Sequence, residues 1–204
     1  MQSDPSKQTQ VILLTICTAV FLIAQSCLGQ GTFIYDQESA NETTRGGQSG
    51  VIQANQPIGQ SFTPALSAIQ FVRLSLGDTA INGIGATVYV NLRTNSITGP
   101  ILASTAPVSM PDAFDGHPNF FFETPVPLAP GTTYFIQPIV QFGDTWTITG
   151  YNYDYLGGTA YIKGAPNELS DLWFREGIII PEPSVLTLLL LGVGLLLRAG
   201  NHRP

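Results

Sequence analysis

Short runs of alternating apolar and polar residues fill the middle of the chain, and two long apolar runs stand near its ends. From 30 to 180 the short runs are separated by Gly, Pro, Asn and Asp, the residues of turns. In 86–93, Val88, Val90 and Leu92 fall on one side of an extended chain and polar residues on the other. No helical periodicity competes with this pattern. It predicts strands at Thr32–Tyr35, Gly50–Gln53, Gly59–Phe62, Ala68–Leu76, Ala86–Arg93, Ile101–Ser104, Asn119–Glu123, Thr133–Val140, Trp146–Tyr151, Thr159–Lys163 and Leu172–Arg175.

About ten strands at this spacing favour one all-β domain, an antiparallel β-sandwich of jelly-roll-like form, over a barrel or a repeat array. The segment 128–135 is similar to the turn and tyrosine-bearing strand of many extracellular sandwich modules. We therefore expect a signal-peptide helix within 1–29, the sandwich over 30–177, and a tail with a transmembrane helix over 178–204.

The first apolar run, 11–24, is fourteen uncharged residues long, which suits a secretion signal and is short for a membrane span. The small residue Gly29 predicts cleavage before Gln30, with cleavage after Ser26 as the alternative. Lipidation of Cys27 is disfavoured because an apolar residue and a small pair do not precede it. Both cysteines of the chain lie before residue 30, so the mature domain would hold no disulfide.

The second apolar run, 184–197, lies between the tripeptide Pro181-Glu182-Pro183 and the basic residues Arg198 and Arg203. A helix of this length spans about 21 Å of a hydrocarbon core that is roughly 30 Å thick, and a thinned bilayer with a snorkelling Arg198 covers part of the difference. The two arginines place the chain end inside and the domain outside. The run is apolar on every side, which argues against a buried terminal helix of the core.

The tripeptide, the apolar run behind it and the closing arginines together resemble the PEP-CTERM sorting tail. The resemblance implies that an exosortase, a membrane-embedded transpeptidase-like enzyme, recognises and cuts the chain near Pro181-Glu182-Pro183. The two prolines favour an extended backbone, which suits presentation to an active-site groove. The runs 59–63 and 171–177 also resemble blocks in other PEP-CTERM proteins of this size, whose domains have no assigned biochemical role.

Charge restricts the partners of the domain. Residues 30–180 hold twelve acidic and five basic residues, a net charge of −7. Such a domain repels phosphate backbones and anionic membrane faces, so nucleic-acid binding is excluded. Nothing in the sequence calls for a cofactor.

No catalytic residue is predicted. His117 is the one histidine of the domain and lies in a turn sequence, Asp115-Gly116-His117-Pro118. Ser49 misses the Gly-x-Ser-x-Gly spacing by one residue.

Metal binding was weighed at two acidic pairs. Asp36 with Glu38, and Asp112 with Asp115, could each offer carboxylates to calcium, but neither lies in a dense acidic loop. Solvated turns are the favoured reading, and no metal site is predicted.

Aromatic residues give the one candidate ligand face. Trp146 is followed by Tyr151, Tyr153 and Tyr155. These tyrosines stand at every second position, so they share one face of an extended chain, with an Asn and an Asp between them. Rings beside amides and carboxylates are the groups that stack on and hydrogen-bond to sugars; edge-strand and core aromatics are the other reading. The residues of this face are Trp146, Tyr151, Tyr153 and Tyr155.

The sequence thus predicts an exported protein without enzymatic activity, anchored in the cell membrane by its C-terminal helix and then displayed at the cell surface or released. Its partners would be the exosortase-type enzyme, the membrane and extracellular polysaccharide. The domain would be a structural or adhesive component of the surface or its polysaccharide matrix. A carbohydrate-binding module is the first alternative and a polysaccharide-acting hydrolase the second.

Overall fold

The computed structural model describes residues 31–181 except 45 and 48. The predicted signal peptide, the tail after Pro181 and both predicted helices lie outside these residues. Within them the chain is all-β, apart from the 3-10 turn η1 (Gln53–Asn55), and the strand pairings of known register are antiparallel. No helix of the described segments is long and apolar enough to cross a membrane.

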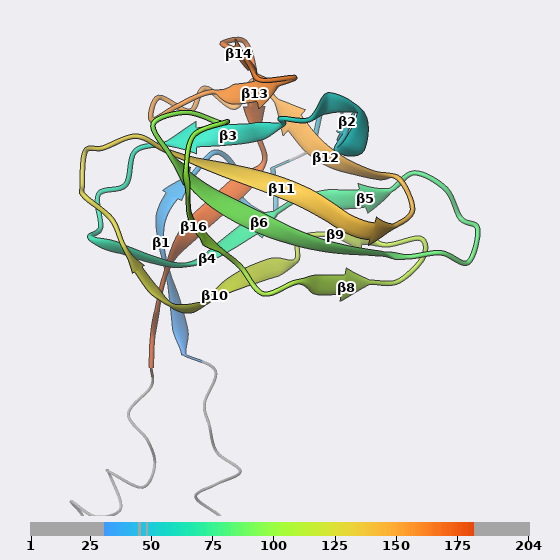
Figure 1. Cartoon of the computed structure of the whole chain (residues 1–204), viewed down its shortest axis with the longest axis horizontal. Helices are drawn as coiled ribbons and strands as arrows, with labels where there is room; N and C mark the ends of the chain where they lie inside the picture. The colour runs from blue at the N-terminus through green and yellow to red at the C-terminus, as the bar shows by residue number, and fades with distance from the viewer. Residues whose placement is uncertain (1–30, 45, 48, 182–204) are drawn as a thin grey trace, which may run out of the picture. The chain divides into compact units, whose positions relative to one another are not determined.

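The strands form three sheets (Figure 1). The first has the order β1-β16-β4-β10, the second β14-β13-β3-β11-β6-β7 with β8 also on β6, and the third β15-β12-β5-β9 with β2 also on β12. The strands are β1 (Thr32–Glu38), β2 (Ser49–Val51), β3 (Gly59–Phe62), β4 (Ala68–Leu74), β5 (Leu76–Asp78), β6 (Ala86–Thr94), β7 (Ile101–Ser104), β8 (Val108–Met110), β9 (Asp115–Gly116), β10 (Asn119–Pro127), β11 (Tyr134–Gly143), β12 (Trp146–Tyr151), β13 (Ala160–Ile162), β14 (Ala165–Asn167), β15 (Asp171–Leu172) and β16 (Phe174–Ile180).

Two of the predicted strands are each divided between sheets. The expected strand Ala68–Leu76 breaks at Ser75, so that β4 pairs with β10 and β16 while β5 pairs with β12 and β9. The expected strand Leu172–Arg175 breaks in the same way at Trp173. These two breaks face each other, since the Ser75 amide donates to the Trp173 carbonyl oxygen at 3.4 Å. Alternation cannot reveal such a break, because both halves continue to bury alternate residues.

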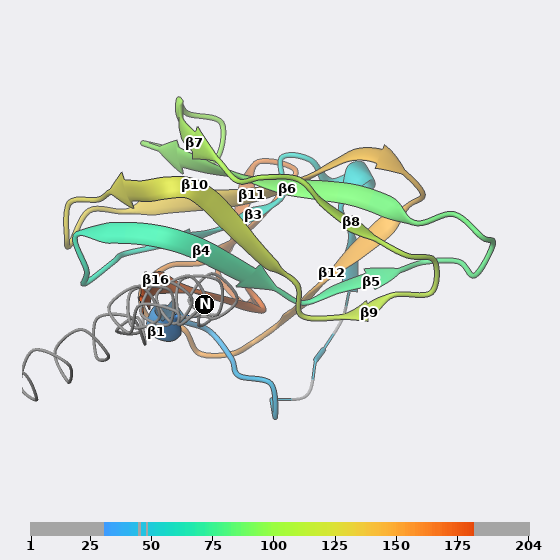
Figure 2. The ribbon, with the colours of Figure 1, turned by 90° about the horizontal axis from the view of Figure 1, so that it is seen from below.

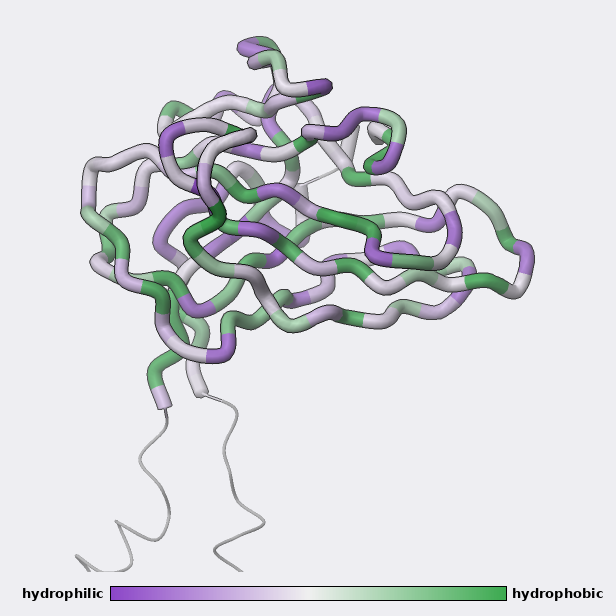
Figure 3. The backbone as a smooth tube through the Cα atoms, in the orientation of Figure 1, coloured by the Kyte–Doolittle hydropathy of each residue, from purple (hydrophilic) through white to green (hydrophobic). Residues whose placement is uncertain are grey.

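The core is made by alternating residues from all three sheets. Val88, Val90 and Leu92 of β6 are fully buried, as the alternation predicted. Thr87 and Asn91 of the same strand are buried too, and each hydrogen-bonds to a serine of a neighbouring strand, Thr87 to Ser109 at 2.8 Å and Asn91 to Ser104 at 2.7 Å. Tyr89 between them is half-buried. Figure 3 shows the alternation of hydrophobic and hydrophilic residues along the central strands.

The first and last strands of the domain are neighbours. The Ser39 amide donates to the Phe174 carbonyl oxygen at 3.1 Å, and farther along the pair the backbone of Gly177 lies against that of Ile34. The two strands therefore run antiparallel and lie side by side (Figure 2). β16 continues through Ile180, so residues 178–180 belong to the strand and not to the tail expected from 178 onward.

Arg175 ties these terminal strands to the loop that follows β1. Its guanidinium donates to Glu38 at 2.6 Å and to Glu42 at 2.7 Å, and it lies over the Tyr35 ring, 3.4 Å from the centroid. Burial alone would raise the pKa of Glu42. A backbone hydrogen bond and the charges of Arg175 and Arg73 outweigh burial, so the pKa of Glu42 is lowered.

Arg175→Lys is expected to destabilise the domain by about 1 kcal/mol, because an ammonium cannot serve two carboxylates and stack flat on a ring. Urea unfolding of the two proteins measures this difference. An unchanged midpoint would mean that the cluster contributes nothing to stability.

Candidate functional site

The four predicted ligand-face aromatics do not share a face. Trp146 is fully buried and stacks on Phe114, with ring centroids 5.7 Å apart. Tyr155 packs edge-on against Phe174 in the core and donates its hydroxyl to Gln37 at 3.0 Å. Of the four, Tyr151 alone is well exposed, at 57%.

Trp146 lies on the opposite face of β12 from Tyr151, because the two are an odd number of positions apart. The tyrosines do not share a face because β12 ends at Tyr151. Beyond it the chain leaves the sheet, and Asp154 takes a left-handed conformation with φ 55° that turns the backbone between Tyr153 and Tyr155. Tyr153 is half-buried and meets the Tyr151 ring edge-on at 5.9 Å. Burial raises the pKa of both Tyr153 and Tyr155.

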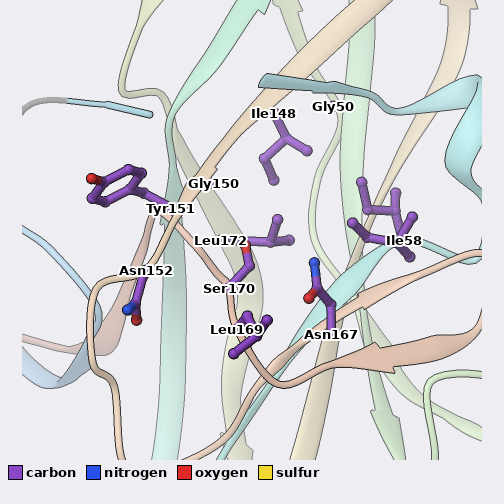
Figure 4. A pocket seen from close by; sticks show the side chains of 11 residues that line it. Gly50, Ile58, Ile148, Gly150, Tyr151, Asn152, Asn167, Leu169, Ser170 and Leu172 are labelled. Atoms are coloured by element: carbon purple, nitrogen blue, oxygen red, sulfur yellow. The ribbon is translucent and has the colours of Figure 1, made fainter. Parts of the chain in front are cut away.

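A cavity of about 430 Å³ lies beside Tyr151, between β12 and the segment that carries β13 and β14 (Figure 4). We call it the β12 cavity. Its volume is within the usual range for ligand sites, roughly 300–1,000 Å³. It is lined by Gly50, Ile58, Ile148, Gly150, Tyr151, Asn152, Ile162, Asn167, Leu169, Ser170 and Leu172.

Two glycines account for this space. Gly50 pairs with Ile148 across β2 and β12, and Gly150 pairs with Leu172 across β12 and β15. A Cβ on Gly50 would meet Ile58 Cδ1 at 3.7 Å, an ordinary contact, so a side chain there would enter the cavity. One on Gly150 would meet the Asp171 carbonyl oxygen at 3.1 Å and Leu172 Cδ2 at 3.6 Å, so a side chain there would crowd the cavity wall. Of the segment 46–50, which is not predicted to carry a nucleophile, Gly50 borders the cavity.

The wall of the β12 cavity is apolar in its depth and polar at its rim. Ile58, Ile148 and Leu172 are buried core residues. Asn167 directs its amide toward the middle of the cavity, whereas Tyr151 and Asn152 stand at one end and point away from it (Figure 4). Among these lining residues of the described chain, none is an acid, a lysine or an arginine.

A second hollow, of about 520 Å³, lies beside Tyr155 and is acidic. Asp154, Glu168 and Asp171 line it. Asp171 already accepts hydrogen bonds from Gln60 at 3.0 Å and from the Tyr155 amide at 3.2 Å, and burial raises its pKa.

Three of the four carboxylates in the two candidate calcium pairs are engaged within the protein, and the fourth, Asp115, is exposed. Asp36 accepts the backbone amides of Ala65 and Leu66, each at 2.9 Å, and Glu38 pairs with Arg175. Asp112 accepts the Asn82 amide at 3.0 Å, and backbone hydrogen bonds lower its pKa. Across 31–181, leaving aside 45 and 48, no three His, Cys, Asp or Glu side chains gather as metal ligands would.

His117 stacks on Trp173, with ring centroids 4.2 Å apart. Burial, and then the charge of Arg73, lower its pKa, so the imidazole is neutral at pH 7. Its ring therefore packs against Trp173, at the turn that the sequence predicted.

Of the sorting motif, Pro181 directly follows β16. The other predicted tail and cleavage residues lie outside the described residues: Glu182, Pro183, Arg198, Arg203, Gly29 and Gln30.

Sequence reasoning missed Glu176. It is fully buried in β16, where its carboxyl lies beside the Asp36 carboxyl and the backbone of Gln37. Burial, and then the neighbouring Asp36 carboxylate, raise the pKa of Glu176 to about 9. The alternation of β16 gave a signal, since Glu176 stands two residues after the core residue Phe174 and so on the same face.

Comparisons with known proteins add no family. No protein-family model matches the chain, and no curated protein matches it. Among solved structures, a chain of the T13 IBDV viral particle is similar over 78% of this chain and 42% of its own length, with 14% sequence identity and a TM-score of 0.28. This chain thus spans less than half of that one, and a likeness so weak carries no argument about function.

Proposed function

We propose that this chain is an exported surface protein whose C-terminal tail is a PEP-CTERM sorting signal cut by an exosortase-type enzyme. One observation carries the proposal: β16 ends at Ile180, immediately before Pro181-Glu182-Pro183. A proline has no amide hydrogen to donate to a sheet, so the tripeptide begins where the folded domain stops. A cut there would remove the tail and leave every strand intact.

The placement of the terminal strands supports the same proposal. Because β1 and β16 are antiparallel neighbours, the domain begins and ends on the same side (Figure 1). Removal of the predicted signal peptide before Gln30 would spare β1, which begins at Thr32. A domain of this design can be held at a membrane by one stalk and released by one cut.

For the domain itself we propose a jelly-roll-like β-sandwich with a structural or adhesive role in the cell surface or its polysaccharide matrix. We include no enzymatic activity in the proposal: Glu176, whose pKa is raised to about 9, is fully buried, and several other candidate acids and bases are engaged within the protein. His117 packs on Trp173, and Asp36, Glu38, Asp112 and Asp171 accept hydrogen bonds or ion pairs.

Deletion of residues 184–204 tests the anchoring step. In its own host the full chain should pass through the inner-membrane fraction before reaching the surface, whereas the deleted chain should be exported without membrane retention, since the apolar run and both arginines are gone. Cell fractionation with an antibody to the domain follows both proteins. Equal membrane retention of the two would contradict the proposal.

A further inference from the structure

The geometry points to the β12 cavity as a binding site for a neutral oligosaccharide, with one sugar held in the cavity and the next lying over the Tyr151 ring. This inference goes beyond the proposed export and processing, because it concerns the folded domain alone. It also differs from the alternating-tyrosine face of the sequence, since neither Trp146 nor Tyr155 takes part in it.

The lining fits both surfaces of a sugar. Ile162 and Leu169, which line the cavity and keep exposed surface, offer apolar contact for ring C–H groups and for methyl substituents. Asn167 and Ser170 offer an amide and a hydroxyl for sugar hydroxyls, and their side chains form no hydrogen bond with another described residue. A site of this kind, apolar in its depth with few polar groups at fixed places, is the usual form of a small-ligand pocket.

The Tyr151 ring is held in place before any ligand arrives. The backbone of Gly47 lies against one side of the ring, so close that a Cβ on Gly47 would overlap it, and Tyr153 meets the ring edge-on. More than half of the side chain is nevertheless exposed. A fixed and exposed ring is a stacking surface that loses little conformational entropy when a ligand binds.

Charge selects a neutral ligand. The cavity offers no basic side chain to balance a carboxylate or sulfate, and the domain around it is acidic. Burying an unpaired anion here would be costly, so uronic-acid polymers are disfavoured. The neutral hydroxyls and N-acetyl groups of glucans, mannans and chitin fit the lining instead.

Calorimetric titration of the full chain in detergent tests the site, with tetrasaccharides of β-glucan, mannan and chitin as neutral probes and an alginate tetrasaccharide as the anionic one. Wild type should bind at least one neutral probe, and Gly50→Leu should abolish that binding because its side chain fills the cavity. Gly50→Ala, whose methyl reaches only ordinary contact distance, serves as the mild variant. Asn167→Ala serves as the second test if Gly50→Leu does not fold.

Tyr151→Ala separates the two parts of the site. It should weaken binding of the tetrasaccharide about tenfold, the order of one aromatic stacking contact, and leave the matching monosaccharide unaffected. Phe142→Ala is the control, since Phe142 is 63% exposed and does not line the cavity. Binding of no neutral probe, preference for alginate, or full binding by both Gly50→Leu and Asn167→Ala would each overturn the inference. Tail processing is untouched by these variants, so either proposal can fail without the other.

Discussion

Glu176→Gln is expected to leave the domain as stable as wild type at pH 5 and to make it more stable at pH 8, by on the order of 3 kcal/mol. The reason is the buried position of Glu176 beside a second carboxyl group, that of Asp36. Burial and the Asp36 carboxylate raise its pKa from 4.5 to about 9, so the folded protein holds this proton at neutral pH. Tyr155 is the other titratable side chain electrostatically coupled to Glu176, and its raised pKa keeps its hydroxyl neutral at neutral pH as well.

The sign of the pH dependence follows from proton binding. Between pH 4.5 and about 9 the folded state holds a proton that the unfolded state releases. Stability therefore falls as pH rises, by at most about 1.4 kcal/mol per pH unit. The raised pKa of Asp171 acts in the same direction. The lowered pKa values of Glu42 and Asp112 act in the opposite direction, but only below pH 4.5, where those carboxylates take up protons.

Urea unfolding at several pH values between 5 and 9 measures this dependence. Wild type should lose stability across the range, and Glu176→Gln should remove most of the slope because an amide stays neutral. Glu123→Gln, at an exposed position of β10, is the matched control and should follow wild type. A flat curve for wild type, or the same slope in Glu176→Gln, would show that Glu176 is not a buried neutral acid.

Trp146→Ala is expected to destabilise the domain by about 3–5 kcal/mol, whereas Tyr151→Ala should change its stability by no more than about 0.5 kcal/mol. Both belong to the aromatic group that the sequence singled out for sugar binding. Trp146 is fully buried against Phe114, so its truncation leaves a large cavity in the core. Tyr151 is exposed at the end of β12, where solvent fills the space that its ring leaves.

Thermal unfolding of the two variants at one pH makes the comparison. The large loss in Trp146→Ala would confirm its role in the core and remove it from any ligand face. A small loss in Trp146→Ala together with a large one in Tyr151→Ala would reverse the assignment of the two residues.

Alternation predicted the longer strands but not all of their ends: β1, β10 and β11 run three or four residues farther than expected, and β2 stops at Val51, before Gln53 enters η1. β3, β7 and β12 have the predicted bounds, and β6 differs by one residue. The divisions at Ser75 and Trp173 could not be predicted, because a strand that changes sheets keeps its period of two. The short strands β8, β9 and β14 were missed because two or three residues carry no period.

The candidate site was predicted less well than the fold. Residues spaced two apart share a face only while the strand continues, and β12 ends at Tyr151, which separates Tyr153 and Tyr155 from it. The β12 cavity depends on Gly50 and Gly150, which are far apart in sequence, and on register across β2, β12 and β15. No local pattern encodes that register, so the cavity becomes visible only in the fold.

Intact mass is the direct test of the proposal that the chain is cut at its Pro-Glu-Pro tripeptide after export. The protein would be isolated from its own host as wild type, as Glu182→Ala and, for control, as Glu168→Ala, which alters an exposed glutamate of the domain. We expect a wild-type species that begins near Gln30 and ends near Pro183, the same species for Glu168→Ala, and an uncut tail in Glu182→Ala. A wild-type protein that keeps residues 184–204, or a Glu182→Ala protein cut like wild type, would contradict the proposal.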